Sequence, residues 1–538
     1  MTSRIGSLAA RARSSRLTAD ERRIARLKWV LGTPYFVQGT SNLAEIPILY
    51  FIKLTLGMGD AGGQLFYSLR NAGWFVKPLW GYLSDRVPLF GYHRKSWFVL
   101  MACLAVVFWG LTAALAYAGV RVPLVYLTTF NLAFATYAFV DVVCDALMVT
   151  EGRRLRRVGA FVNFQWTMLA VANAGAVFLG GWLQGKVETG AIEPWVIFLL
   201  TGVPPLFTAA VGLRNIDEES VPARARAAPW PVSRTWLAHL PAQLARGARA
   251  LPASLRDFRR RNRVIWLLVL FIFFWKFSPS IGYIERSYLI DERAFTAFSF
   301  GVILSVGSVV FLLSILTYRW VVRRFPAVRW HQYLYAMIAL ALLAFPLSFF
   351  LYLDPDHPWW DYVYVTLPPE LNPLPEWNRY QWFRLITQTV LGSPRSPFII
   401  PLTIAGETVK LEYAGVGYAF LMSLANVTDM FEGVVGAALY DLFSRPCVSW
   451  LIEAFAGSPL DIAHRRRAHA DPRDVRLHRP AVHAAHDPVP PHAAARARAP
   501  RRHDQARPRR AVSALGRPAD ARRRPTCSRG RAKPSREA

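Results

Sequence analysis

Two acidic residues lie one helical turn apart in an otherwise apolar stretch of the sequence. Asp141 and Asp145 are spaced i and i+4, so both carboxylates would project from one face of a helix. An ionised carboxylate at the centre of a bilayer costs about 3 kcal/mol, and pairing or protonation removes that cost. Repulsion between close carboxylates favours a proton on one of them, so we predict a proton-coupling site here. In the alternative interpretation, Asp145 and Glu151 lie at the membrane surface and pair with arginines of segment 153–156.

Glu45 is a third carboxyl group in an apolar stretch and a further candidate for proton coupling. It lies two residues before Pro47, which would open the helix, so that carbonyl groups and the carboxylate could line a cavity. Lys53 follows within about two helical turns, so Glu45 could equally lie at the outer membrane interface.

Cationic and polar side chains recur inside the apolar stretches, where they suit an anionic ligand. A guanidinium group binds a carboxylate through two parallel hydrogen bonds. Each arginine could instead pair with an internal carboxylate such as Glu285 or Asp429. A flat heteroaromatic ring could stack on Trp275 or Phe277, although most membrane aromatics face lipid. The candidate ligand-binding residues are Arg70, Lys77, Lys276, Arg286, Arg384, Trp275 and Gln388.

The sequence lacks the usual signals of an enzyme. There is no glycine-rich phosphate loop, no His/Cys metal cluster and no nucleophile–base arrangement at usable spacing. The four cysteines have neither metal-ligand nor disulfide spacing. We therefore expect no enzymatic activity, no cofactor and no bound metal.

Apolar helices must position these side chains. Of the 538 residues, 53% are hydrophobic and 18% are charged, and the mean hydropathy is +0.22. A run of about 20 apolar residues crosses a hydrocarbon core of roughly 30 Å, which excludes a soluble enzyme here. Membrane-crossing segments are predicted at 29–51, 63–83, 96–118, 122–148, 158–184, 194–213, 263–289, 297–318, 330–352, 380–405 and 414–443.

Lysine and arginine are distributed unequally between alternate loops. With the N-terminus in the cytoplasm, the cytoplasmic segments hold 31 of these residues and the opposite loops hold 6. Because translocation of positive charge is disfavoured, this bias predicts a multi-pass protein of the cell inner membrane with a cytoplasmic N-terminus.

The spacing of the segments divides the chain into two halves. Residues 1–28 form a cytoplasmic segment, 29–213 a six-helix bundle, 214–262 a basic cytoplasmic linker, and 263–445 a second bundle with five detectable helices. Two bundles joined by a long basic loop are the layout of the major facilitator superfamily. The predicted fold class is an all-α membrane protein with a major facilitator fold that lacks its twelfth helix.

Residues 446–538 break this pattern. Within them, 464–538 hold 21 Lys and Arg against 6 Asp and Glu, so half of the net charge of +29 belongs to this tail. A composition of Arg, Ala, His and Pro cannot bury a core, and we expect disorder. GC-rich codons read out of frame give this composition, so we favour a frameshift that replaced a twelfth helix. A natural polybasic extension and an odd-numbered topology are the alternatives.

Four stretches resemble the folate–biopterin transporter family. They are 35–39 (YFVQG), 77–95 (KPLWGYLSDRVPLFGYHRK), 141–151 (DVVCDALMVTE) and, in the second half, 421–426 (LMSLAN). The likeness covers about residues 30–445, and His93 stands where the family usually has an arginine. It implies a proton-coupled carrier, with folates or pterins as solutes.

The segment 77–95 also carries the predicted gate. Gly81 permits close helix packing, and Asp85 can cap the next segment or accept a hydrogen bond from an arginine across the bundle. In carriers of this superfamily such a loop works as a latch; alternatively, it is only a short basic loop. The candidate gating residues are Gly81, Asp85, Arg86, Arg94 and Lys95.

The leading hypothesis is a secondary active transporter of folate, pterin-like or other organic anions, with proton symport. Its expected partners are a small-molecule solute, protons and the lipid bilayer, without nucleic acid, and it is expected to act as a monomer. The alternatives are a carrier-shaped assembly or pigment-delivery factor without transport, and a carrier for another solute such as peptidoglycan fragments. A lipid-facing aromatic groove would favour the delivery factor.

Overall fold

The structure is a computed structural model. It describes residues 19–86, 89–216, 218, 263–325, 329–353, 355–361, 374, 376–392, 399–408 and 414–444. Most of the predicted N-terminal segment, nearly all of the linker 214–262 and the tail lie outside these residues, as do the proposed frameshift and the missing twelfth helix. The side chains of Asp85, Arg86 and Trp275 also lie outside the described part.

The first half of the chain forms helices at all six predicted crossings. The first crossing consists of α2 (Ala19–Thr40), a 3₁₀ turn (Ser41–Ala44), α3 (Glu45–Tyr50) and a π-helical turn (Phe51–Thr55). The second consists of α4 (Asp60–Leu69), a 3₁₀ turn (Ala72–Trp74) and α5 (Lys77–Arg86). The others are α6 (Lys95–Tyr117), α7 (Pro123–Arg154), α8 (Val158–Glu188) and the pair α9 (Pro194–Thr201) and α10 (Pro205–Asn215).

The second half forms helices at the five crossings predicted there. They are α13 (Arg263–Lys276) with α14 (Gly282–Arg293), α15 (Ala297–Arg324), α16 (Trp330–Ala344) continued by a 3₁₀ segment (Phe345–Tyr352), α17 (Arg379–Gly392) with α18 (Ile399–Thr408), and α19 (Ala414–Phe443). A further 3₁₀ turn (Pro358–Asp361) precedes α17.

Several crossings are interrupted rather than continuous. Among the described residues, five spans are long and apolar enough to cross a membrane: 95–117, 123–154, 158–188, 194–215 and 297–318. The segment predicted as one helix over 263–289 is instead two helices separated by residues 277–281. Pro279 explains the break, because proline has no N–H and its ring clashes with the preceding turn. Interrupted helices of this kind surround the central sites of many carriers.

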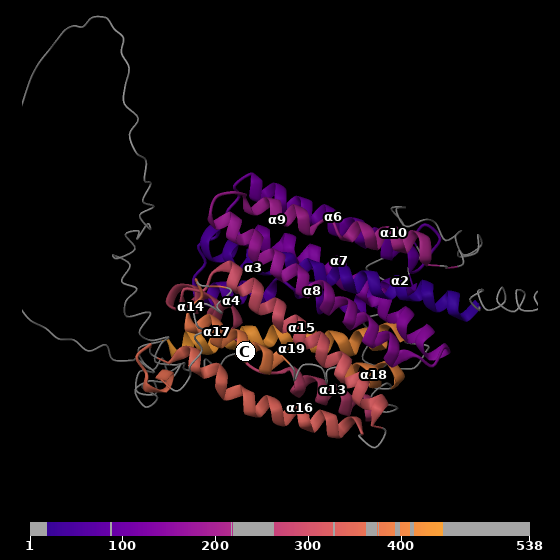
Figure 1. Cartoon of the computed structure of the whole chain (residues 1–538). Helices are drawn as coiled ribbons and strands as arrows, with labels where there is room; N and C mark the ends of the chain where they lie inside the picture. Colours follow the sequence, from indigo (N-terminus) through magenta and orange to yellow (C-terminus); the bar gives the residue numbers. More distant parts are fainter. Residues whose placement is uncertain are drawn as a thin grey trace, which may run out of the picture.

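The two halves pack against each other along two pairs of crossings. Helix α8 lies along α15, and α19 lies against α4 and α5 (Figure 1). Gly181 and Gly301 bring the backbones of α8 and α15 together, since a Cβ atom on Gly181 would lie 2.6 Å from the Gly301 Cα atom. Nearby, the Asn173 amide donates a hydrogen bond to the Ser308 hydroxyl at 2.6 Å.

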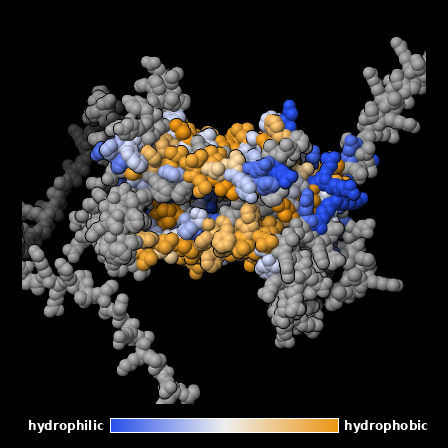
Figure 2. Space-filling view, turned by 90° about the horizontal axis from the view of Figure 1, so that it is seen from below, coloured by the Kyte–Doolittle hydropathy of each residue, from blue (hydrophilic) through white to orange (hydrophobic). Residues whose placement is uncertain are grey.

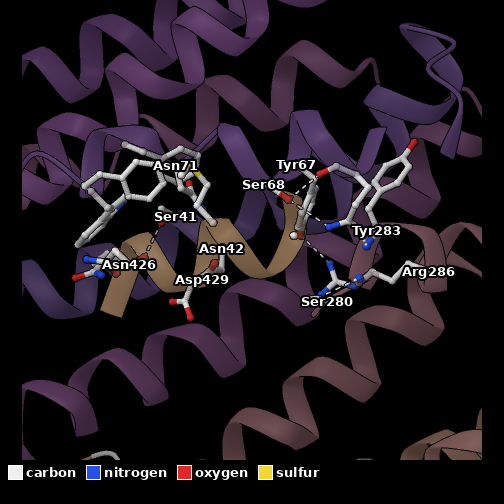
Figure 3. Close-up of a pocket in the computed structure, with 18 of the residues that line it drawn as sticks. Ser41, Asn42, Tyr67, Ser68, Asn71, Ser280, Tyr283, Arg286, Asn426 and Asp429 are labelled. Atoms are coloured by element: carbon white, nitrogen blue, oxygen red, sulfur yellow. Dashed lines mark hydrogen bonds between the residues drawn. The ribbon is translucent and has the colours of Figure 1, made fainter. Parts of the chain in front are cut away.

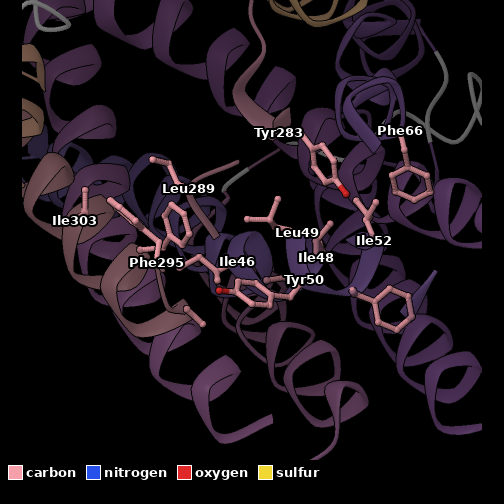
Figure 4. Close-up of a cluster of buried hydrophobic side chains, with 14 of the residues drawn as sticks. Ile46, Ile48, Leu49, Tyr50, Ile52, Phe66, Tyr283, Leu289, Phe295 and Ile303 are labelled. Carbon is pink, nitrogen blue, oxygen red and sulfur yellow. The ribbon is translucent and has the colours of Figure 1, made fainter. Parts of the chain in front are cut away.

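Hydrophobic clusters join the halves at both ends of the molecule, which we call the Lys53 end and the Arg153 end. At the Lys53 end, Ile46 and Phe66 of the first half pack in one cluster with Leu289 and Phe295 of the second (Figure 4). A second cluster combines residues of α2, α7 and α8 with residues of α18 and α19. Between the ends, the outer surface carries a broad apolar area (Figure 2).

Candidate functional site

A polar chamber lies between the two halves of the molecule. It consists of neighbouring cavities of about 420, 650 and 110 Å³. Gln38 and Asn426 line both the first and the third, Arg286 lines the first and the second, and Lys276 lines the second and the third. Figure 3 shows the first cavity, where Tyr67 of α4 faces residues of α14 and α19.

Asp141 and Asp145 of α7 line the smallest cavity and share one cation. The Lys77 ammonium of α5 lies 2.5 Å from the Asp141 carboxylate, and the two side chains are only 4% and 6% exposed. Asp145 is also buried, and it accepts a hydrogen bond of 2.9 Å from the Tyr35 hydroxyl of α2. Two buried carboxyl groups therefore face a single lysine, and with both of them ionised this cluster would carry one negative charge beyond what Lys77 neutralises.

In the alternative interpretation Asp145 pairs with an arginine of segment 153–156, but the structure shows it buried and hydrogen-bonded to Tyr35 instead. Glu151 forms its ion pair with Arg23 of α2 at 2.6 Å, and Arg153 donates two hydrogen bonds to the Gly406 carbonyl of α18. The first contact holds the Arg153 end of α7 to α2, and the second holds it to the other half.

Glu45 lies between two guanidinium groups from different halves. Its carboxylate contacts Arg70, directly after α4, at 2.5 Å and Arg286 of α14 at 2.9 Å. Arg286 also donates a hydrogen bond of 2.8 Å to the Tyr67 hydroxyl, and the Arg70 guanidinium stacks over the Tyr67 ring at 3.7 Å. Because two cations face one carboxylate, this cluster carries one positive charge beyond what Glu45 neutralises.

Interrupted helices place the members of this cluster. The 3₁₀ turn Ser41–Ala44 ends directly before Glu45, so Asn42 and Glu45 both face the larger cavity. Arg286 belongs to the short helix that follows the break at Pro279. A continuous helix in either place would give these side chains a different rotation about the helix axis.

Of the remaining predicted ligand-binding residues, some line the chamber and others do not. Lys276 and Gln388 line the 650 Å³ cavity, and Lys276 pairs with Asp429 at 2.8 Å. Arg384 pairs with Glu285 at 3.0 Å and does not line the three cavities. Stacking of a ligand on Trp275 remains a prediction, since that side chain lies outside the described part.

A set of polar contacts closes the Lys53 end across the two halves. Lys53 lies 2.7 Å from Asp291 and donates a hydrogen bond to Ser287. Asp60 accepts hydrogen bonds from Ser287 and from Tyr440 of α19. These contacts tie the first and second crossings to α14 and α19.

The predicted gating loop is held by a carboxylate that the sequence analysis did not single out. Glu218 accepts hydrogen bonds from the backbone N–H groups of His93, Arg94 and Lys95, at the start of α6. A carboxylate at this position satisfies free amide groups and interacts favourably with the helix dipole. Gly81 lies inside α5. Whether these residues gate transport remains a prediction.

Four further residues of the chamber, the Lys53 end and the predicted gating loop were missed. Tyr35, Tyr67, Asp60 and Glu218 owe their positions to contacts between segments distant in sequence. The only local signal was the i, i+3 spacing of Tyr67 and Arg70, which puts both on one face of α4.

Comparison with known sequences matches this chain to one family and to several of its relatives. The sequence model of the BT1 family matches residues 38–359. A folate-biopterin transporter from Synechocystis sp. is 28% identical over 75% of this chain and 73% of its own length. A probable folate-biopterin transporter 4 from Arabidopsis thaliana is 30% identical over 33% of this chain and 35% of its own length.

Solved structures show the fold. A D-xylose–proton symporter aligns over 82% of this chain and 96% of its own, with a TM-score of 0.53 and 12% identity. An auto-inhibited peptide transporter of the POT family aligns over 83% of this chain and 94% of its own, with a TM-score of 0.51 and 15% identity. The predicted major facilitator fold is therefore confirmed.

Proposed function

Because this chain belongs to the BT1 family, we propose that it is a proton-coupled carrier that moves folates, pterins or related organic anions by alternating access. The family and the fold make it a multi-pass membrane transporter of a small-molecule solute rather than an enzyme. The observation that carries the proposal is the pair of buried carboxylates facing one lysine beside the chamber.

The acidic cluster supports proton coupling. In apolar surroundings an unpaired carboxylate is costly unless it takes up a proton. Asp141 has Lys77 as its partner, whereas among the described residues Asp145 has only the hydrogen bond from the Tyr35 hydroxyl. We therefore assign the transported proton to Asp145.

The chamber supports an anionic, partly aromatic solute. Arg286 and Lys276 face the 650 Å³ cavity, which Trp166 and Phe311 also line. Cavities of a few hundred Å³ with a few polar groups among apolar walls are typical of small-molecule sites. Glu45, with its two arginines, is assigned to the solute site rather than to the proton.

The orientation and domain boundaries complete the proposal. The Arg153 end faces the cytoplasm, as the charge bias of the loops favours, and the membrane is the inner membrane. The first bundle spans 29–213 and the second 263–445, and the molecule acts as a monomer.

Uptake into membrane vesicles tests this function. Labelled folate and labelled biopterin are offered with and without an inward proton gradient, to the parent chain and to Asp145→Asn. We expect the parent to accumulate at least one of the two compounds, and only with the gradient, and we expect no accumulation by D145N. Equal uptake by the parent with and without a gradient would remove the coupling, and no uptake of either compound would remove the solute class.

One observation favours the non-transporting alternative. An apolar groove of about 710 Å³ is lined by first-half residues, including Trp29, Phe36, Phe164 and Phe207. In a bilayer, lipid chains fill such a groove, and the groove does not account for the buried charges. Absorption spectra and mass spectrometry of organic extracts of the purified chain distinguish a carrier from a pigment-delivery factor. A pigment bound in equimolar amount would support the delivery factor.

A further inference from the structure

The charges around the chamber form two clusters with opposite excess. Arg70, Glu45 and Arg286 are two cations and one anion. Lys77, Asp141 and Asp145 are one cation and two anions. A buried charge without a counter-charge costs several kcal/mol, so each cluster favours a ligand of the opposite sign. One carboxylate would neutralise the first cluster, and one proton would neutralise the second.

The surroundings of Asp145 leave its charge uncompensated. Lys276 lines the same cavity but pairs with Asp429, and this pair contributes no net charge. The titratable and charged groups that face Asp145 are Tyr35 on α2, Lys77 on α5, Asp141 and Cys144 on α7, Lys276 on α13, and Tyr418 and Asp429 on α19.

We propose that the solute enters as one carboxylate together with one proton, the carboxylate binding Arg286 in exchange for Glu45 and the proton binding Asp145. This inference rests on the proposed transport function and narrows its solutes to those that present a carboxylate. Glu45 then serves as the internal stand-in for the solute anion when the chamber is empty.

The geometry of Arg70 and Arg286 makes the exchange feasible. Arg286 is 23% exposed and lines two of the cavities, whereas Arg70 is only 6% exposed. The Nε and Nη1 atoms of Arg70 are buried and have no hydrogen-bond partner. When the solute takes Arg286, Glu45 can turn its freed oxygen to one of these donors and form a two-pronged pair with Arg70. Arg70, Glu45 and Arg286 therefore each keep a partner of opposite charge before and after the exchange.

The exchange also has a mechanical consequence. The contact between Glu45 and Arg286 joins α3 of the first half to α14 of the second. A solute carboxylate that replaces Glu45 removes this link between the halves near the Lys53 end. Solute binding would thereby favour separation of the halves there, while the proton cluster is contained in α5 and α7 of the first half.

The charge count gives a measurable stoichiometry. A solute with one carboxylate and one proton moves no net charge, whereas a solute with two carboxylates and one proton moves one negative charge. Each net charge changes the steady-state accumulation by a factor of about 50 at a membrane potential of 100 mV. Solutes with different numbers of carboxylates therefore report the number of protons.

Proteoliposomes with a clamped membrane potential test this count at a fixed pH gradient. Pteroate has one carboxylate, folate has two and biopterin has none. We expect pteroate accumulation to be the same at 0 and −100 mV, folate accumulation to fall about 50-fold at −100 mV, and biopterin not to accumulate. A potential-dependent accumulation of pteroate, or accumulation of biopterin equal to that of pteroate, would overturn the inference.

A second measurement tests the coupling of carboxylate and proton binding without depending on which solute the chain transports. The purified chain in weakly buffered detergent solution is mixed with acetate, benzoate or glutamate, and a pH indicator reports proton uptake. We expect an uptake of one proton per chain in the parent and no proton uptake in D145N or in Arg286→Gln. Glu45→Gln lacks the competing charge, so we expect it to bind the carboxylate about tenfold more tightly. Proton uptake without pterin transport would contradict only the proposed solute class, whereas no proton uptake with any carboxylate would overturn the inference.

Discussion

The ammonium group of Lys77 lies 2.5 Å from the carboxylate of Asp141, and both side chains are almost fully buried. This pair joins α5 to α7 inside the first bundle. Removing one partner of a buried pair leaves the other charge uncompensated, which typically costs about 3–5 kcal/mol.

The first prediction concerns the stability of the protein when the Lys77–Asp141 pair is removed in part or as a whole. Lys77→Met alone is expected to destabilise the protein by about 3–5 kcal/mol, and Lys77→Met with Asp141→Asn is expected to recover most of that loss. Thermal unfolding in detergent measures both. Asp429→Asn, in the partly exposed pair with Lys276, is the control and should cost about 1 kcal/mol or less. Equal losses for the single and the double variant would contradict the coupling.

Asp145 gives a second prediction, on coupling rather than stability. D145N keeps the shape of the side chain and the Tyr35 contact but has no proton to exchange. We expect it to lose gradient-driven accumulation while retaining exchange of labelled for unlabelled solute across vesicles, because exchange needs no net proton movement. Retained accumulation would show that the proton binds elsewhere, and loss of both activities would point to a damaged solute site.

The contact between Lys53 and Asp291 gives a third prediction, on closure of the Lys53 end. Lys53→Met removes the ion pair of 2.7 Å and is expected to increase labelling of a cysteine placed at Ser280 by a membrane-impermeant thiol reagent. The assay needs a background without the four native cysteines. The charge exchange Lys53→Asp with Asp291→Lys restores opposite charges and should return labelling toward the parent level. Unchanged labelling in K53M would show that the other contacts close this end alone.

Gly181 gives a fourth prediction, with a control in the same helix. A Cβ atom there would lie 2.6 Å from the Ala297 carbonyl oxygen and from the Gly301 Cα atom, so Gly181→Ala must push α8 and α15 apart. We expect a loss of about 1–3 kcal/mol in thermal unfolding and slower transport. Gly175→Ala meets nothing within 4 Å and should stabilise the helix by about 1 kcal/mol. Equal effects of the two would contradict the packing argument.

The sequence predicts the crossings well because each one is a local property. Apolar runs of the right length mark the eleven helical regions found among the described residues, and the i, i+4 spacing correctly places Asp141 and Asp145 on one buried face of α7. The break at Pro279 was underestimated, since one proline inside a long apolar run does not by itself distinguish a kink from two helices.

The partners of the charged residues could not be predicted in the same way. That Lys77 pairs with Asp141, and that Glu45 lies between Arg70 and Arg286, depends on how α4, α5 and α14 pack around the first and fourth crossings. Spacing along one helix carries no information about rotation of its neighbours. Tyr35 gave no signal for the same reason, and Tyr67 gave only its i, i+3 spacing from Arg70.

The contact between Gly181 and Gly301 lies far from the middle of α8, with Glu188 seven residues away on one side and Val158 twenty-three on the other. At 1.5 Å per residue the two arms measure about 10 and 35 Å. A rotation of the bundles by about 10° with this contact as its pivot would displace their tips by about 2 and 6 Å. Such a rotation would open the end with the longer arm roughly three times as far as the end with the shorter arm. The wider opening would admit a bulky solute most easily. The narrower opening would set the upper limit on the size of the solute.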